Sequence, residues 1–430
     1  MTDAPPAGVT VFTFEVTLSG AVLNPGNVDL LAGKGPIRIE VKRLETETAF
    51  LNTSNVPAGT YTSLQLTFAS PELTFRNDTG LPLPPPLPPC ASLTVCEIDP
   101  AGTLTSTINL APGLTIGNNS PTGVLIDLDL GTLLTSDLDV DFSLNNSATV
   151  RQVALPNQPT GQFQEIEDLT GIVANKDAVN NRFTLQTAFH GNFDVMVNSS
   201  TLFEDFDGCS ASPSNFTCVQ NLQAVEVDLG LLAGGTFFAR KIELEDNEDA
   251  DDEIEGVIVE VVDSTKFQMV MLDSLRTIAD VSLGSLVAVA LQGNTDFRVD
   301  DNGLNVDSTL LSAFEGAIDT SQLMAGQHVQ VRRRTGPPTD IETDRVRLRM
   351  SRFTATVSDP PGSSNFNIGS LPGLFPSGSE IEVRTSLETD FDGASGVADL
   401  PVGTVVSLRG LLFKGTTPPP ILFADKVRKR

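Results

Sequence analysis

The residues best suited to chemistry are four cysteines, which fall into two close pairs, Cys90 with Cys96 and Cys209 with Cys218. Each pair brackets a short segment of small and polar residues that is typical of a loop. Two disulfides across such loops would favour an oxidising compartment, and four free thiols are the alternative interpretation. A zinc site is disfavoured, because neither spacing is Cys-x-x-Cys and the two histidines lie in unrelated places.

Paired carboxylates recur in Asp205-Phe-Asp207 and in Asp390-Phe-Asp392, and a glycine follows each pair. Calcium binds about six to eight oxygen atoms, which carboxylates and backbone carbonyls supply. Asp205, Asp207, Asp390 and Asp392 are therefore candidate calcium ligands, although the closing glutamate of an EF-hand loop is missing. The other interpretation is an ordinary Asp-Gly turn after a strand. The sequence thus requires no cofactor and leaves calcium as the candidate ion.

The chain is poorly equipped for catalysis. A serine or cysteine nucleophile usually needs a positioned base, and the chain has 2 histidines, His190 and His328. Neither lies near a serine-elbow or acidic motif, so both are expected to be ordinary surface or turn residues. Dispersed carboxylates could serve a hydrolase, but carbohydrate sites usually offer aromatic platforms, and this chain has no Trp and 1 Tyr. We therefore expect a protein that is not an enzyme.

Charge is unevenly distributed along the chain. The formal net charge of −28 argues against nucleic-acid binding, because phosphates attract clustered Lys and Arg. Arg345, Arg347 and Arg349 alternate along one face of a predicted strand, and Lys426 and Arg428 lie near the C-terminus. One interpretation is pairing with carboxylates of the same chain. The other is head-to-tail self-association, in which this basic region contacts the acidic first domain of another copy and the contact propagates into filaments.

An acidic segment at residues 243–255 carries nine carboxylates in thirteen residues. Repulsion between like charges should keep such a segment extended and solvated. We therefore expect a linker between domains, with weak collection of divalent ions as its alternative role.

The spacing of apolar residues predicts strands almost throughout. Phe12, Phe14 and Val16 alternate with polar residues, and so do Leu64 and Leu66. A period of two marks half-buried strands, and Gly, Pro, Asn and Asp interrupt them at short intervals. A chain of 430 residues is also too long for one small core, which indicates several domains.

A repeat runs through the second half of the chain. The anchors Thr201-Leu-Phe203, Thr295-Asp-Phe297 and Thr389-Asp-Phe391 recur at an interval of 94 residues. A strand with a central Phe precedes each anchor, and a closing strand ends each unit. An interval of this length indicates a duplicated domain rather than a turn of a solenoid. Short strands in small units favour barrels, which leave no sheet edge exposed.

These patterns predict an all-β protein with an N-terminal β-sandwich followed by three tandem small β-barrel-like (OB-like) domains. The sandwich is expected at residues 1–160, and the barrels at residues 166–246, 254–350 and 351–430.

The first domain resembles the bacterial family DUF4382. The matching segments are residues 1–5, 12–23 and, above all, 56–68. The three repeats resemble DUF5666 through their Thr-x-Phe anchors and closing strands. The resemblance implies an exported and often lipid-anchored bacterial protein, and it brings no catalytic residues. It also implies a signal sequence upstream, because the printed chain opens without one.

No stretch approaches the roughly 20 apolar residues of a membrane-spanning helix, so we expect membrane contact only through a lipid anchor outside this sequence. The features together predict an exported, non-enzymatic structural protein of the cell surface or extracellular matrix. Its expected partner is a further copy of itself, for instance in a fibre joined head to tail. The alternative is a surface-exposed binding or adhesion module that recognises a polymer or divalent cations.

Overall fold

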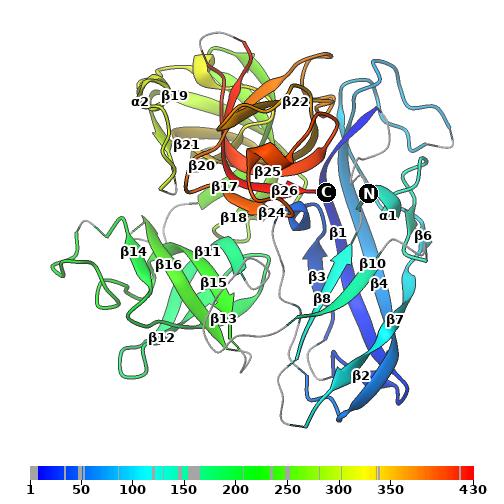
Figure 1. The fold of residues 1–430 in the computed structure, drawn as a ribbon. Coiled ribbons are helices and arrows are strands. Elements are labelled where there is room, and N and C mark those ends of the chain that lie inside the picture. Colours follow the sequence, from blue (N-terminus) through cyan, green and yellow to red (C-terminus); the bar gives the residue numbers. More distant parts are fainter. Residues whose placement is uncertain are drawn as a thin grey trace.

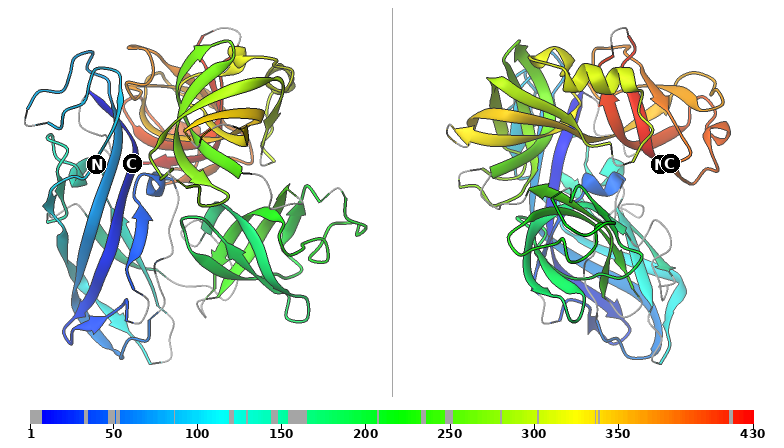
Figure 2. Two further views of the ribbon diagram at one scale, coloured as in Figure 1. Left: turned by 180° about the vertical axis from the view of Figure 1, so that it is seen from behind. Right: turned by 90° about the vertical axis from the view of Figure 1, so that its left-hand side faces the viewer.

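The computed structural model confirms the all-β class. Figures 1 and 2 show an elongated first domain (blue to cyan) alongside three smaller units (green to red). In the part of the chain that the structure describes, no helix has both the length and the apolar character needed to cross a bilayer. The described residues are 8–32, 35–46, 51, 54–85, 87–118, 122–128, 130–143, 148–153, 165–206, 208–232, 236–246, 252–279, 281–301, 303–335, 337, 339–415 and 418–430.

Two long antiparallel strands, β1 (Val9–Asn24) and β4 (Gly59–Asn77), form the centre of the first domain. The shorter elements are β2 (Val28–Asp29), β3 (Ile37–Glu40), η1 (Arg43–Glu45), β5 (Val95–Ile98), β6 (Gly102–Thr103), β7 (Thr105–Ile116), β8 (Gly123–Leu128), α1 (Leu130–Leu133), β9 (Val140–Asp141) and β10 (Ala148–Val153). Alternate side chains of β1, such as Phe14 and Leu18, are buried in one core. The small sheet of β8 and β10 packs on the same core through Ile126, which makes the domain two-layered.

A similar order of strands then occurs three times, with a helix added in repeat 2. Repeat 1 contains β11 (Glu165–Asp177), β12 (Arg182–Gln186), β13 (Asn192–Met196), β14 (Leu202–Glu204), β15 (Ala224–Leu231) and β16 (Phe237–Asp246). Repeat 2 contains β17 (Asp252–Asp263), β18 (Lys266–Ser274), β19 (Leu286–Val299), α2 (Ser308–Glu315), η3 (Thr320–Gln322), β20 (His328–Thr335) and β21 (Asp340–Val357). Repeat 3 continues along β21 and adds β22 (Asn365–Gly369), β23 (Ile381–Arg384), β24 (Asp390–Asp392), η4 (Val397–Asp399), β25 (Val405–Phe413) and β26 (Ile421–Lys429).

Each repeat folds its sheet back on itself by the same pairing scheme. In repeat 1 the strands pair in the order β13-β12-β11-β15-β16, and a parallel pairing of β13 with β16 joins the ends. In repeat 2 the parallel pairing of β19 with β21 has this role, and in repeat 3 that of β23 with β26. The closure is uneven: in repeat 1 it consists of Val195 opposite Phe237 and Met196 opposite Phe238.

The boundary expected between residues 350 and 351 falls inside a continuous strand. β21 pairs with β20 as far as Arg349 and with β25 from Met350 onward. Repeats 2 and 3 therefore share this strand within one 10-stranded sheet. Because Leu411 and Phe413 of repeat 3 also enter the core of repeat 2, the two repeats pack as one unit.

Both expected cysteine pairs form disulfides, Cys90 with Cys96 and Cys209 with Cys218. The Cα atoms lie 6.0 Å and 5.4 Å apart, within the range that a disulfide spans without backbone movement. No described cysteine is free. This cysteine usage suits an oxidising environment.

The threonine of each anchor makes an equivalent contact in all three repeats. Its hydroxyl donates a hydrogen bond to a backbone carbonyl of the closing strand, where the register of that strand shifts. The three bonds run from Thr201 to Ala239 (2.7 Å), from Thr295 to Thr343 (3.1 Å) and from Thr389 to Ala424 (2.7 Å). The interval of 94 residues in the sequence thus marks a bond that ties the anchor strand to the closing strand.

We expect Thr389→Val to lower the free energy of unfolding by about 1–3 kcal/mol, because the buried carbonyl of Ala424 loses its donor. Valine keeps the branched shape that strands favour. Thr389→Ser is the matched control, since it removes a methyl group but keeps the hydroxyl. Urea unfolding of both variants measures the effect, and a valine variant at least as stable as the serine variant would contradict this role.

Candidate functional site

Polar side chains on the outer face of the repeats are buried where the repeats meet. In an isolated small barrel, the outward-facing positions of a strand contact water and carry polar residues. In repeat 1, Thr170, Glu226 and Glu243 lie opposite one another on three adjacent strands. All three are buried, and Glu226 has no exposed surface. This polar face of repeat 1 is therefore covered by other parts of the protein.

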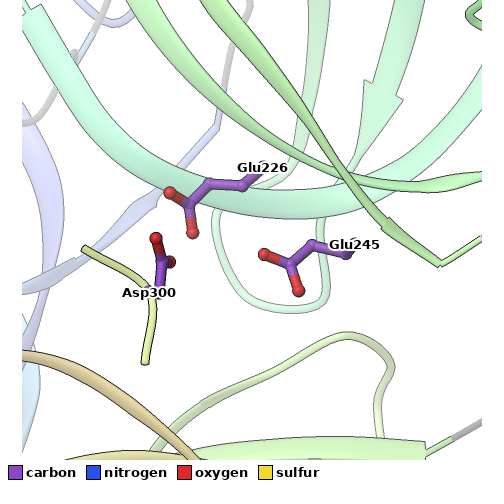
Figure 3. A group of neighbouring side chains, drawn as sticks. All are labelled: Glu226, Glu245 and Asp300. Atoms are coloured by element: carbon purple, nitrogen blue, oxygen red, sulfur yellow. The ribbon is translucent and has the colours of Figure 1, made fainter. Parts of the chain in front are cut away.

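Carboxylates of repeat 1 meet guanidinium groups of repeat 2 at this contact. Arg347 contacts Glu245, and Nη1 of Arg349 lies 3.3 Å from Oε1 of the same carboxylate. Arg349 also contacts Glu226 and, within its own repeat, Asp300. Figure 3 shows the three carboxylates converging, two from strands of repeat 1 and Asp300 from repeat 2. We call these five residues, Arg347, Arg349, Glu226, Glu245 and Asp300, the ionic junction.

The carboxylates of the ionic junction have the spacing of metal ligands but already hold cations from the protein. Among the described residues, Glu226, Glu245 and Asp300 form a group whose ligand atoms all lie within 4.8 Å of one another. The guanidinium of Arg349 contacts all three, and Nζ of Lys241 lies 3.9 Å from Glu226. Since positive charge is already present at the point of convergence, the group acts as a structural ion cluster rather than as a calcium site.

Repeat 3 contacts repeat 1 through a second set of ion pairs. Arg409 contacts Asp168, and its Nη1 lies 2.5 Å from Oε2 of Glu167. Arg352 reaches Asp168 at 2.9 Å, and Lys426 reaches Glu167 at 2.9 Å. Burial alone would raise the pKa of Asp168, but Arg409 and Arg352 outweigh it and hold that pKa well below its ordinary value.

A bulge in β11 places Glu167 and Asp168 for these contacts. The pairing of β11 with β15 shifts register between Ile166 and Leu169, and Asp168 adopts a φ of +53°. This left-handed conformation is uncommon for a residue other than glycine and persists only where the surroundings impose it. Here the bulge turns two successive acidic side chains toward the arginines of repeat 3.

The first domain joins the same region through η1 and the C-terminus of the chain. Arg43 donates hydrogen bonds to the backbone carbonyls of Glu167 and Asp168, both at 3.3 Å. Arg430, the last residue, donates to the carbonyl of Glu45 at 2.7 Å. All four domains therefore converge around repeat 1.

A cavity of about 100 Å³ lies at this convergence, and we call it the junction cavity. Its lining comes from the first domain (Arg43), repeat 1 (His190), repeat 2 (His328) and repeat 3 (Phe353 and Phe375), together with the ionised groups described above. The lining contains both apolar and charged side chains, so the cavity can hold a small molecule that has both characters.

The structure corrects the expectation for His328, which lies in β20 and is buried, whereas His190 lies in the turn between β12 and β13 and is partly exposed, as expected. His190 and His328 line the same cavity. Nε2 of His190 lies 3.2 Å from Asp273, and Nδ1 of His328 lies 3.0 Å from the carbonyl oxygen of Met350. Burial lowers the pKa of His328 to about 4, so its imidazole is neutral at pH 7. No local motif could have shown this, because the turn that carries His190 and the strand that carries His328 are far apart in the sequence.

None of the described candidate calcium ligands lines the junction cavity. Asp205 is exposed, and Asp207 lies outside the described residues. Asp390 and Asp392 belong to β24, and Oδ2 of Asp392 accepts a hydrogen bond from Nε of Arg428 at 2.8 Å. None of the described three belongs to the carboxylate group that has metal-ligand spacing.

The basic residues expected to join two copies make their contacts within one chain. Arg347, Arg349 and Lys426 are buried against carboxylates of repeat 1, as described above. Arg345 lies 3.6 Å from Glu253, and Arg428 binds a carboxylate of its own repeat. These contacts fit the interpretation as intramolecular pairs, in which Arg347, Arg349 and Lys426 are buried and Arg345 and Arg428 are partly exposed.

The acidic segment differs from the solvated linker that its composition predicted. Glu243 and Glu245 end β16, Glu253 and Glu255 begin β17, and all four are buried. Residues 247–251 lie outside the described part of the chain. The prediction counted only repulsion along the segment and omitted the arginines of β21, which are about a hundred residues away in sequence.

Comparison with known proteins identifies one part of the chain. Residues 170–243, within repeat 1, match the family model described as "Domain of unknown function (DUF5666)". No curated protein matches the chain. One similar solved structure is a "multidomain protein with nucleic acid binding domains" from Streptococcus pneumoniae TIGR4. Its sequence identity is 9%, the alignment covers 60% of this chain and 72% of that one, and the TM-score of 0.13 supports no argument about fold or function.

Proposed function

We propose that this protein is an exported, non-enzymatic structural protein of the cell surface or extracellular matrix. The observation that carries the proposal is the packing of four domains into one body. Domains joined only by linkers usually move relative to one another, unless a large and apolar interface holds them. Here Phe12 of the first domain shares an apolar cluster with Phe353 and Phe375 of repeat 3. Such a body can transmit force or keep a fixed spacing, which a structural protein requires.

The ionic junction supports the same role in a different way. Buried ion pairs add little net stability compared with apolar packing, but they specify which surfaces meet. Opposite charges on the outer faces of repeats 1 and 2 therefore select one arrangement of otherwise similar barrels. The two disulfides suit an oxidising environment, and export is the simplest way for the chain to reach one.

The family assignment extends beyond the matched segment in this proposal. Repeats 2 and 3 have the pairing scheme and the Thr anchor of repeat 1, which supports a common origin for all three as DUF5666-like domains. We assign the first domain to DUF4382 on the resemblance of residues 56–68. Both families would place the protein outside the cytoplasm.

Cell fractionation and electron microscopy test the proposal. We expect the protein in the surface or extracellular fraction, and ordered multimers when the purified full-length chain is concentrated. Because Arg345, Arg347, Arg349 and Lys426 are engaged within the chain, assembly must use other surfaces. A cytoplasmic location would contradict export, and monodisperse monomers at high concentration, with and without calcium, would contradict assembly.

The alternative function is a surface-exposed binding module, and divalent cations are its simplest ligand. A thermal melt with and without millimolar calcium separates the two, since a ligand that binds only the folded state raises the melting temperature. Asp390→Asn is the matched variant for the calcium site. An unchanged melting temperature in the native chain would remove calcium as a ligand.

A further inference from the structure

The junction cavity has the size of a small-molecule site. Its volume is about 100 Å³, whereas an engineered cavity of roughly 150 Å³ in another protein admits benzene. An occupant therefore has about six non-hydrogen atoms or fewer. Lys42, Arg43 and His190 line the cavity and are only half-buried, so its edge reaches the surface of the molecule.

The lining contains three acceptor atoms that lack a hydrogen-bond donor. Oε1 of Glu45, Oδ1 of Asp168 and Nε2 of His328 are buried acceptors, and none receives a hydrogen bond from the part of the chain that the structure describes. All three side chains line the cavity and are more than nine-tenths buried. A buried acceptor without a donor destabilises the folded protein, so these positions favour an occupant that carries O–H or N–H groups.

The charges of the two carboxylates are already balanced. The other oxygen of Glu45 contacts Lys42, and Oδ2 of Asp168 contacts Arg352 and Arg409. A cationic occupant would compete with these groups for the same oxygens, and an anionic occupant would be repelled by the carboxylates. Because the carboxylate charges are already paired, the cavity favours an occupant that has hydrogen-bond donors but no net charge.

His328 provides an acceptor of defined form. Its Nδ1 lies 3.0 Å from the carbonyl oxygen of Met350, so Nδ1 carries the proton and Nε2 presents a lone pair. Oε2 of Glu255 lies 3.6 Å from Nε2, which is too long for a direct hydrogen bond. A single hydroxyl group can lie within hydrogen-bonding distance of both atoms.

The lining also contains part of an apolar cluster, formed by Phe12, Phe353, Leu374 and Phe375. A small molecule that carries both hydroxyl groups and carbon atoms matches the unpartnered acceptors and this apolar cluster. We propose that the junction cavity is a binding site for a small neutral polyol. Because such a ligand would contact side chains of all four domains, its binding would also stabilise their arrangement.

Binding of glycerol to the full-length protein tests the proposal, measured by calorimetry and by ligand-observed NMR. We expect saturable binding of glycerol and at least about tenfold weaker binding of 1-propanol, which has one hydroxyl group. Ethanolamine and glycolate, which are charged, should also bind at least about tenfold more weakly. Equal binding of all four probes, or no saturable binding of glycerol, would overturn the proposal.

The variant His328→Leu should weaken glycerol binding at least about tenfold, because it removes the acceptor at Nε2. Arg298→Met is the matched control, since Arg298 is half-exposed and pairs with Asp296 away from the cavity lining. If the leucine variant does not fold, a crystal structure of the native protein soaked in glycerol decides. Glycerol in the cavity would support the proposal, and a cavity filled by water alone would refute it. This result does not depend on what fractionation and microscopy show about the structural role.

Discussion

Replacing Arg349 by methionine is expected to lower the free energy of unfolding by about 3–5 kcal/mol. Removing one partner from a buried ion cluster leaves the remaining charges uncompensated in a poorly solvated place. Arg349 is 4% exposed and contacts Glu226, Glu245 and Asp300 from two repeats. Methionine has a similar length and no charge, so the loss would come mainly from electrostatics. Chemical denaturation of the full-length protein measures it.

Arg298→Met is the control for this substitution, because it removes an arginine from the same repeat. Arg298 pairs with Asp296 at 2.6 Å, but the side chains are 50% and 48% exposed. An exposed pair contributes about 0–1 kcal/mol, so this variant should resemble the native protein. Equal effects of Arg349→Met and Arg298→Met would show that the ionic junction does not hold the repeats together.

Neutralising the partners should restore most of the lost stability. In a variant that combines Arg347→Met and Arg349→Met with Glu226→Gln, Glu245→Gln and Asp300→Asn, the arginines and carboxylates of the junction are all neutral, and Lys241 keeps its contact with Glu243. Replacing a whole buried ion cluster by neutral groups is often close to neutral in stability. A combined variant no more stable than Arg349→Met alone would assign the loss to packing instead.

Acidification is expected to destabilise the native protein by up to about 3 kcal/mol more than it destabilises His328→Gln, between about pH 7 and pH 4. Burial lowers the pKa of His328 to about 4 from its ordinary value of 6.5. Between these two values the unfolded chain binds a proton that the folded protein excludes. The stability contributed by the neutral imidazole is thus fully present above pH 6.5 and is lost as the pH falls toward 4.

Comparison with His328→Gln removes the contribution of other buried groups. Burial raises the pKa of Asp228 to about 6 and that of Glu243 to about 7, so their contribution is present at low pH and decreases as the pH rises. Both the native protein and the variant contain these carboxyls, and the difference between the two proteins reports His328. Denaturant unfolding at several pH values measures the difference, and parallel pH profiles would contradict the prediction.

The features that the sequence predicted correctly are those encoded by neighbouring residues. Alternation of apolar and polar side chains indicated strands, because successive side chains of a strand point to opposite faces. The short separation of Cys90 from Cys96 makes a disulfide geometrically simple, whatever the rest of the fold does. The recurrence of Thr201, Thr295 and Thr389 marked the three repeats, since each threonine makes its bond within its own repeat.

The environment of the polar face could not be predicted in this way. Alternation separates the two faces of a strand but does not say whether the polar face contacts water or another domain. Glu245 and Arg349 look like surface residues in their own segments, and only the packing of repeat 1 on repeat 2 buries them together. The role of the bulge at Asp168 could not be predicted either, because its carboxylate pairs with arginines of repeat 3 that are distant in the sequence.

By itself, the sequence determined the all-β class, the two disulfides and the three anchors, because local spacing and periodicity specify them. Only the tertiary structure decided that the basic strand and the acidic segment bind each other, and that His190 and His328 share one cavity. The physical reason is that charge complementarity and burial depend on pairs of residues from different domains. Such pairs become neighbours only when all four domains have packed.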